Sequence, residues 1–258
     1  MRKTIAIAIG VLALAMAGAA PAAPKRPFTD WVAVVVAGDF KGSRGGDTEA
    51  FDNARRDIAK VLVDRMGFQP ANVRQFSVRP DRYNPKPQRS TLFNIQDNLQ
   101  AMAGKTKGGC LFYFTSHGIP QGAYLNNEDP TKESFIFPVA MAELVNSACP
   151  GRPTIVVVST CFSGAHMLAL REDDRLVMTA ARRDRSSFGC GENNTYPYFD
   201  ECFLEAANGV DSFAALPPAV LACVRRMERE TGAAPPSEPQ VWIGPGIQPL
   251  LPLYAFGK

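Results

Sequence analysis

Residues 154–164 read TIVVVSTCFSG, an apolar run that ends in a cysteine set among small and polar residues. Its β-branched side chains do not alternate with polar ones, which is typical of a strand buried on both faces of a parallel sheet. Working outward from this run, similar or shorter strand patterns occur at residues 31–37 (WVAVVVA), 73–78, 110–115 (CLFYFT), 176–180 and 240–244, the last as an edge strand.

Helical patterns separate these strands. Asp47 and Thr48 offer an N-cap for a helix that ends at Met66-Gly67, and Ser90 offers one for the next helix. Further helices are predicted from Pro138 to Ala148 and over residues 197–208 and 217–231, with a hairpin joining residues 123–125 to 134–137. Strands that alternate with helices predict an α/β fold, with a mainly parallel sheet flanked by helices.

The amino terminus has the pattern of a secretory signal peptide. Arg2 and Lys3 precede an apolar run, and A-x-A sequences at residues 17–19 and 20–22 fit a cleavage site. The competing reading is a membrane anchor, but a spanning helix needs about 20 apolar residues and this run is shorter. We therefore expect a signal peptide at residues 1–22 and an exported, periplasmic or secreted product without stable membrane insertion. Residues 23–258 are expected to form a single domain, with a proline-rich connector at about 233–239 before the tail.

Charge and composition exclude some classes of partner. The chain has 28 basic and 25 acidic residues, a formal net charge of +3, so no strong field draws it to nucleic acid. Nothing in the sequence predicts a cofactor, and the oligomeric state is left open.

Two reactive side chains follow separate apolar strands. His117 comes after the strand at 110–115, and Cys161 comes after the strand at 154–159. Ligand sites of parallel sheets lie at the carboxyl ends of the strands, so these side chains are expected to meet there. A thiolate attacks a carbonyl while an imidazole moves the proton, which predicts a nucleophile and its base. The N–H groups of Gly118 and Cys161 are the predicted oxyanion donors.

Cys161 and His117 also have non-catalytic interpretations. A single cysteine or histidine is more often structural than catalytic, and only the joint placement of the two favours chemistry. His166 lies near the cysteine, but an α/β-hydrolase would need glycine where Ser159 stands and a later histidine. No C-x-x-C or H-x-x-x-H spacing predicts a zinc site.

The paired motifs FYFTSHG and VVVSTCFSG resemble the His and Cys motifs of the legumain family of cysteine peptidases. The segments VVVAGDF and LVMTAARRDRSSFGC resemble the family's first strand and its specificity-pocket segment, so the likeness covers residues 31 to about 205. The resemblance implies a three-layer caspase-like fold. It also implies a cysteine endopeptidase that acts on protein or peptide substrates through a thioester, after Asn or Asp, with His117 and Cys161 catalytic and Gly118 in the oxyanion hole.

The same resemblance proposes a substrate pocket. Ser186 and Ser187 match its serines, and Asp200 is expected to reach it from the following helix. Phe162 stands where legumains have an acidic residue, and Thr48-Glu49 where they have an Arg-His pair, for which Arg44 could substitute. If Arg44 and a neighbouring acid both face the pocket, they would bind an asparagine before the cleaved bond. If the acids Asp184, Glu192 and Asp200 determine the charge of the pocket, Arg or Lys would be favoured there. Asp39 is read either as a residue that orients His117 or as a turn residue.

Two alternative functions remain open at this point. The same thioester could pass to an amine, which would make the protein a transpeptidase or ligase. The chain could also be a non-catalytic exported binding domain. Its six cysteines allow bridges, with Cys110–Cys149 and Cys202–Cys223 as possible pairs and Cys190 as a free thiol at the pocket rim, but sequence alone does not give the pairing.

Overall fold

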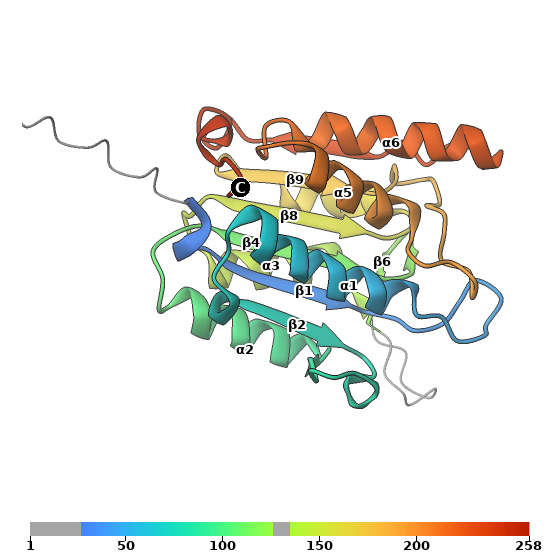
Figure 1. Cartoon of the computed structure of the whole chain (residues 1–258), viewed down its shortest axis with the longest axis horizontal. Helices are drawn as coiled ribbons and strands as arrows, with labels where there is room; N and C mark the ends of the chain where they lie inside the picture. The colour runs from blue at the N-terminus through green and yellow to red at the C-terminus, as the bar shows by residue number, and fades with distance from the viewer. Residues whose placement is uncertain (1–26, 126–134, 258) are drawn as a thin grey trace, which may run out of the picture.

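A computed structural model of the chain describes residues 27–125 and 135–257 (Figure 1). The predicted signal peptide at residues 1–22 and the turn expected between residues 126 and 130 lie outside the described residues. Within them, no helix has the length and apolar character needed to cross a membrane.

A seven-stranded sheet forms the middle layer, in the order β10-β9-β8-β4-β1-β2-β3. All neighbouring strands are parallel except β10, which runs antiparallel to β9 at one edge. The predicted strands are confirmed, with bounds β1 Val32–Ala37, β2 Val73–Ser77, β4 Cys110–Thr115, β8 Thr154–Ser159, β9 Arg175–Thr179 and β10 Gln240–Ile243. The short edge strand β3 Gln88–Arg89 was not predicted.

Helices cover both faces of this sheet and complete the three layers (Figure 1). One face carries α1 (Ala50–Val61), α5 (Tyr198–Gly209) and α6 (Leu216–Thr231), which contact one another in that order. The other carries α2 (Leu92–Ala103), α3 (Pro138–Ala148) and the short α4 (Met167–Leu170). Short 3-10 turns lie at Pro27–Asp30, Pro70–Asn72, Pro80–Arg82, Ser163–His166 and Leu251–Leu253.

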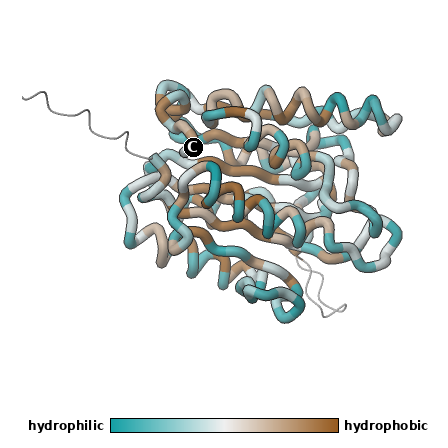
Figure 2. Tube along the Cα trace, in the orientation of Figure 1, coloured by the Kyte–Doolittle hydropathy of each residue, from teal (hydrophilic) through white to brown (hydrophobic). Residues whose placement is uncertain are grey.

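The strands are buried on both faces because apolar side chains point alternately into two cores. On β1, Ala33 and Val35 pack toward α1 and α5, while Val34 and Val36 pack toward α2 and α3. The hydrophobic colour of Figure 2 follows the central strands. This two-sided burial explains why the strand runs read as continuous rather than alternating.

Helix boundaries differ slightly from expectation. Thr91, not Ser90, caps α2, with its hydroxyl accepting from the Asn94 N–H at 3.2 Å. Ser90 instead donates to the Ala37 carbonyl at 2.9 Å and ties the loop to the end of β1. After α1, a π-helical turn (Leu62–Met66) precedes Gly67, whose φ of 91° ends the helix as predicted.

A small second sheet follows His117 directly. It consists of β5 (Gly118–Ile119), β6 (Gly122–Tyr124) and β7 (Phe135–Ile136), all antiparallel. The pairing of β6 with β7 confirms the predicted hairpin.

Two disulfides stabilise the fold. Cys110–Cys149 joins the start of β4 to the end of α3, and Cys202–Cys223 joins α5 to α6. Both pairs are among those that the sequence allowed. Cys161 and Cys190 remain as free thiols.

Candidate active site

The two predicted reactive residues lie at the same edge of the sheet. Strands β4 and β8 are neighbours, with Thr115 paired to Ser159, and the Ser116 N–H donates to the Ser159 carbonyl at 3.1 Å. His117 and Cys161 each follow this register by two residues. The sheet therefore brings together the ends of two motifs that are separated along the chain by a crossover containing α3.

Gly118 allows these strand ends to approach closely. A Cβ atom at this position would lie 2.2 Å from the Cys161 carbonyl oxygen and 2.8 Å from the Thr160 hydroxyl. No other residue fits this spacing without displacing the Cys161 backbone.

The His117 ring is held from one side by the backbone. Its Nε2 atom lies 2.8 Å from the Lys41 carbonyl oxygen, and Phe51 packs edge-on against the ring at 5.1 Å. Because a carbonyl oxygen only accepts, this contact assigns the proton to Nε2 and leaves Nδ1 as the acceptor of the neutral ring.

Asp39 supports this arrangement through the backbone of the loop after β1. Its buried carboxylate accepts from the N–H groups of Phe40 at 2.6 Å and Lys41 at 3.0 Å. These bonds form a turn that presents the Lys41 carbonyl. The turn interpretation of Asp39 is therefore confirmed, and Lys41 is a residue that sequence reasoning missed, because its contribution is a backbone atom.

Cys161 is half-buried and contacts the loop after β9. The Ser187 N–H donates to the Cys161 sulfur at 3.3 Å, and the Ser187 carbonyl and hydroxyl oxygens lie 3.6 Å from it. Among the described residues, the hydrogen bonds of this sulfur all involve Ser187 and none joins it to His117. Catalytic hydrogen bonds of unliganded sites are often long and form when substrate binds.

The residue after Cys161 turns the chain sharply. Phe162 adopts a left-handed conformation with φ 56° and ψ 15°, and its N–H donates to the Arg185 carbonyl at 2.8 Å. Bulky residues rarely adopt positive φ, and such strain gathers at functional sites.

A cavity of about 490 Å³ lies beside Cys161, between the loop after β1 and the loop before α5. Its lining includes Ser43, Arg44, Ser187 to Gly191, Glu192, Asn193 and Asn194. Arg44 and Ser187, which the resemblance assigned to a substrate pocket, both line this cavity. Ser186 is exposed and is not part of this lining.

One ion pair joins the two loops across this cavity. Glu192 accepts from the Arg44 Nε atom at 3.2 Å and from the N–H groups of Arg44 and Gly46 at 3.1 and 3.2 Å. Backbone N–H donors and the Arg44 guanidinium lower the pKa of Glu192. The pair consequently adds no net charge to the cavity.

Cys190 is the second free thiol and lines the same cavity. Burial, and then the neighbouring Cys161, raises its pKa to about 12. Cys190 is therefore a thiol, not a thiolate, at neutral pH.

Asp200 does not reach the cavity, so its predicted substrate contact is wrong. Its side chain is fully buried under the sheet, where it accepts from the Tyr113 hydroxyl at 2.5 Å and the Thr115 hydroxyl at 2.6 Å. Burial raises its pKa to about 6. The helical pattern placed Asp200 correctly on α5 but did not show that this turn of the helix faces the core.

His166 has the character of a core residue. It is 1% exposed, and burial lowers its pKa to about 4, so the ring is neutral at physiological pH. In the parts of the chain that the structure describes, no three metal-binding side chains come together.

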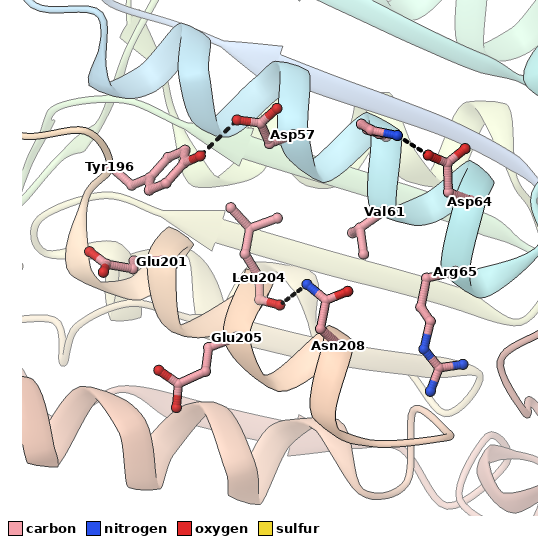
Figure 3. A pocket seen from close by; sticks show the side chains of 10 residues that line it. Asp57, Val61, Asp64, Arg65, Tyr196, Glu201, Leu204, Glu205 and Asn208 are labelled. Carbon is pink, nitrogen blue, oxygen red and sulfur yellow. Dashed lines mark hydrogen bonds and ion pairs between the residues drawn. The ribbon is translucent and has the colours of Figure 1, made fainter. Parts of the chain in front are cut away.

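A separate groove of about 500 Å³ lies between α1 and α5 (Figure 3). Several of its polar groups bind each other, with Tyr196 donating to Asp57 at 2.7 Å and Lys60 paired with Asp64. Apart from Tyr196, which lies at the end of the loop before α5, the residues lining it belong to α1, the π-helical turn after α1, and α5.

Comparisons with known proteins agree with this geometry. Residues 91–212, which hold both strand-end motifs, match the model of the Peptidase C13 family. Among solved structures, caspase-1 from Spodoptera frugiperda has a similar fold, with a TM-score of 0.58 at 13% identity over 87% of this chain and 92% of that one. A search of curated proteins found no match. The match of residues 91–212 to the Peptidase C13 family and the caspase-like fold support a cysteine-type peptidase of the legumain and caspase type.

Proposed function

We propose that the protein is an endopeptidase in which Cys161 is the nucleophile and His117 the general base and acid. The observation that carries the proposal is the hydrogen bond from His117 Nε2 to the Lys41 carbonyl at 2.8 Å. This bond leaves Nδ1 of the neutral ring as a proton acceptor. His117 follows β4, and the neighbouring strand β8 ends just before Cys161, which with Cys190 is one of the two free thiols of the described chain.

The chemistry follows in two steps. His117 Nδ1 takes the thiol proton, and the sulfur attacks the peptide carbonyl carbon to give a tetrahedral oxyanion. The N–H groups of Gly118 and Cys161 stabilise that oxyanion, and the imidazolium then gives its proton to the leaving amine. The thioester that forms is attacked by a water molecule, whose proton passes to Nδ1. The acid product leaves, and the thiol is restored.

The Ser187 N–H has a separate part in this scheme. At 3.3 Å from the sulfur, it donates to negative charge there before attack. The same hydrogen bond fixes Ser187 at the junction between the nucleophile and the substrate cavity.

The cavity suits a neutral, polar residue on the acyl side of the cleaved bond. Arg44 and Glu192 offer a donor and an acceptor of compensating charge, and Ser43 and Ser187 add hydroxyls. An asparagine carboxamide can pair with both kinds of group. An aspartate or a lysine would bring an uncompensated charge into the cavity, so we propose preferred cleavage after asparagine.

The test uses matched peptides with Asn, Asp or Lys before the cleaved bond, and the variants Cys161→Ala and His117→Ala. We expect fastest cleavage after Asn and loss of at least about 10³ in kcat in each variant. Retained cleavage by either variant would contradict the assignment. Product masses measured with an added amine distinguish hydrolysis from amine transfer, the alternative outcome of the same thioester.

We further propose that the protein acts outside the cytoplasm. The apolar pattern of residues 1–22 and the Cys110–Cys149 and Cys202–Cys223 disulfides support this, because such bonds persist in oxidising compartments. Cell fractionation and N-terminal sequencing test it, with Ala23 expected as the first residue. A full-length product retained in the cytoplasm would refute export.

A further inference from the structure

The buried Asp200 lies beneath the two strands that carry the reactive residues. It is 0% exposed and sits in the first turn of α5, where the positive end of the helix dipole favours a negative charge. One carboxylate oxygen accepts from the Tyr113 hydroxyl at 2.5 Å and the other from the Thr115 hydroxyl at 2.6 Å. The Ser159 hydroxyl makes a smaller hydrogen-bonding contribution that lowers the pKa of Asp200.

Thr115 and Ser159 lie at the carboxyl ends of β4 and β8. Thr115 precedes His117 by two residues, and Ser159 precedes Cys161 by two residues. Thr115 and Ser159 are also paired across β4 and β8. Asp200 therefore contacts the last paired register of the sheet before both reactive residues, from a helix that belongs to neither motif.

An acid at this place is costly for packing alone. Burying a carboxylate costs several kcal/mol unless hydrogen bonds compensate, and apolar replacement of buried polar groups is often neutral or stabilising. A leucine would be apolar like the other buried residues of α5, among them Phe199, Cys202 and Phe203, but it could not accept hydrogen bonds from the two hydroxyls of β4. The hydrogen bonds thus give this position a geometric constraint that an apolar side chain lacks.

We propose that Asp200 is a positioning residue that holds the ends of β4 and β8 so that His117 and Cys161 reach their reactive separation, an inference that rests on the proposed function. Asp200 acts through Thr115, which donates to its carboxylate and is paired with Ser159 across β4 and β8, and does not touch substrate. Small displacements of reacting groups are sufficient for a large effect, since about 1 Å can cost a hundredfold in rate.

The ionised carboxylate is the form that accepts from both hydroxyls. Its pKa of about 6 lies in a range where activity can be measured, and protonation would remove one acceptor. Tyr113 on β4 is the titratable group in contact with it, and the pKa of that phenol is raised well above its usual value by burial and then by Asp200. Among the described residues, no charged side chain is a cause of the raised pKa of Asp200.

The experiment compares Asp200→Asn, Thr115→Val and Thr154→Val in the full mature enzyme. Asp200→Asn keeps the shape and removes the charge, while Thr115→Val removes one hydrogen bond near His117. Thr154→Val is the matched control, because Thr154 is equally buried but lies at the opposite end of β8, where its hydroxyl donates to Arg152. The readouts are kcat, KM and the pH dependence of Cys161 alkylation by iodoacetamide.

We expect Asp200→Asn to lower kcat at least about tenfold with KM within about twofold, and Thr115→Val to lower kcat by a smaller factor. The ionisation near pH 6 should disappear from the kcat and alkylation profiles of Asp200→Asn, which a purely structural role would not cause. Thr154→Val should retain wild-type kcat and profiles. If Asp200→Asn does not fold, Thr115→Val and Tyr113→Phe carry the same test.

Wild-type kcat and an unchanged pH profile in folded Asp200→Asn would overturn the inference. That failure is distinct from failure of the proposed function. In the first case Cys161→Ala and His117→Ala are inactive while Asp200→Asn is normal, and in the second either of those dyad variants still cleaves peptides.

Discussion

The backbone of Gly118 lies against the carbonyl of Cys161 so closely that a Cβ on the glycine would be 2.2 Å from that oxygen. Real Cβ atoms do not approach backbone oxygens to this distance, so a larger residue must push the two strand-end motifs apart. The contact explains in steric terms why the histidine is followed by glycine.

Gly118→Ala should therefore inactivate the enzyme without unfolding it. We expect kcat to fall at least about a hundredfold, because the Cys161 backbone and the predicted oxyanion donors are displaced together. Steady-state kinetics and thermal unfolding of the purified variant measure this. The control is Gly209→Ala at the end of α5, where an added Cβ meets no atom within 4 Å and activity should be retained. Full activity in Gly118→Ala would show that the close contact relaxes freely.

The two free thiols should differ in reactivity. Burial raises the pKa of Cys190 to about 12, so this thiol is almost entirely protonated at pH 7, whereas the Ser187 N–H donates to the Cys161 sulfur. Limited alkylation with iodoacetamide followed by peptide mapping should label Cys161 first. Cys190→Ser should leave the labelling rate unchanged, and preferential modification of Cys190 would contradict the electrostatics described for the cavity.

Removing the charge of Glu192 should change the preferred substrate. In Glu192→Gln the Arg44 guanidinium loses its counter-charge, so the cavity becomes positive. The kcat/KM for peptides with Asp should therefore rise relative to that for peptides with Asn. We expect the Asn-to-Asp ratio of kcat/KM to fall about tenfold. The control is Glu201→Gln, a charge-removing change at an exposed acid of α5 that does not line this cavity, and it should keep the wild-type ratio. An unchanged ratio in Glu192→Gln would mean that the Arg44–Glu192 pair does not face the substrate.

Asp200 should also shape the dependence of stability on pH. Its pKa is about 6 in the folded chain against an ordinary 3.8, so between these values the folded state binds the proton more tightly than the unfolded state. The free energy of unfolding therefore falls as pH rises through this window, by roughly 3 kcal/mol in all.

Asp200→Asn should remove this slope. Urea unfolding of both proteins between pH 4 and 7 tests it, and the difference in unfolding free energy (variant minus wild type) should increase up to pH 6 and then level off. In Thr154→Val the corresponding difference should stay constant with pH. A constant difference for Asp200→Asn as well would mean that the carboxyl titrates alike in both states.

Several features of the fold followed from local patterns. Continuous β-branched runs predicted the buried strands, and the positions of His117 and Cys161 after two of them predicted one site, because parallel strands end at a common edge. The Pro138 start of α3 was equally visible in the sequence. The two disulfides are pairs that the sequence allowed, but the sequence did not give the pairing. These features depend on side-chain type and spacing, which a sequence states directly.

The tertiary structure alone decided how the site is held. Two backbone groups hold the site: the Lys41 carbonyl accepts from the His117 ring, and the Ser187 N–H donates to the Cys161 sulfur. Every residue has a backbone carbonyl and every residue except proline has a backbone N–H, so residue type does not reveal which of these groups contribute to a site. The sequence shows an aspartate at position 200, but it does not show whether the side chain lines a cavity or lies in the core. Only the packing of α5 against β4 and β8 places its carboxylate under Thr115, because burial depends on which distant segments cover a residue and not on its neighbours in the chain.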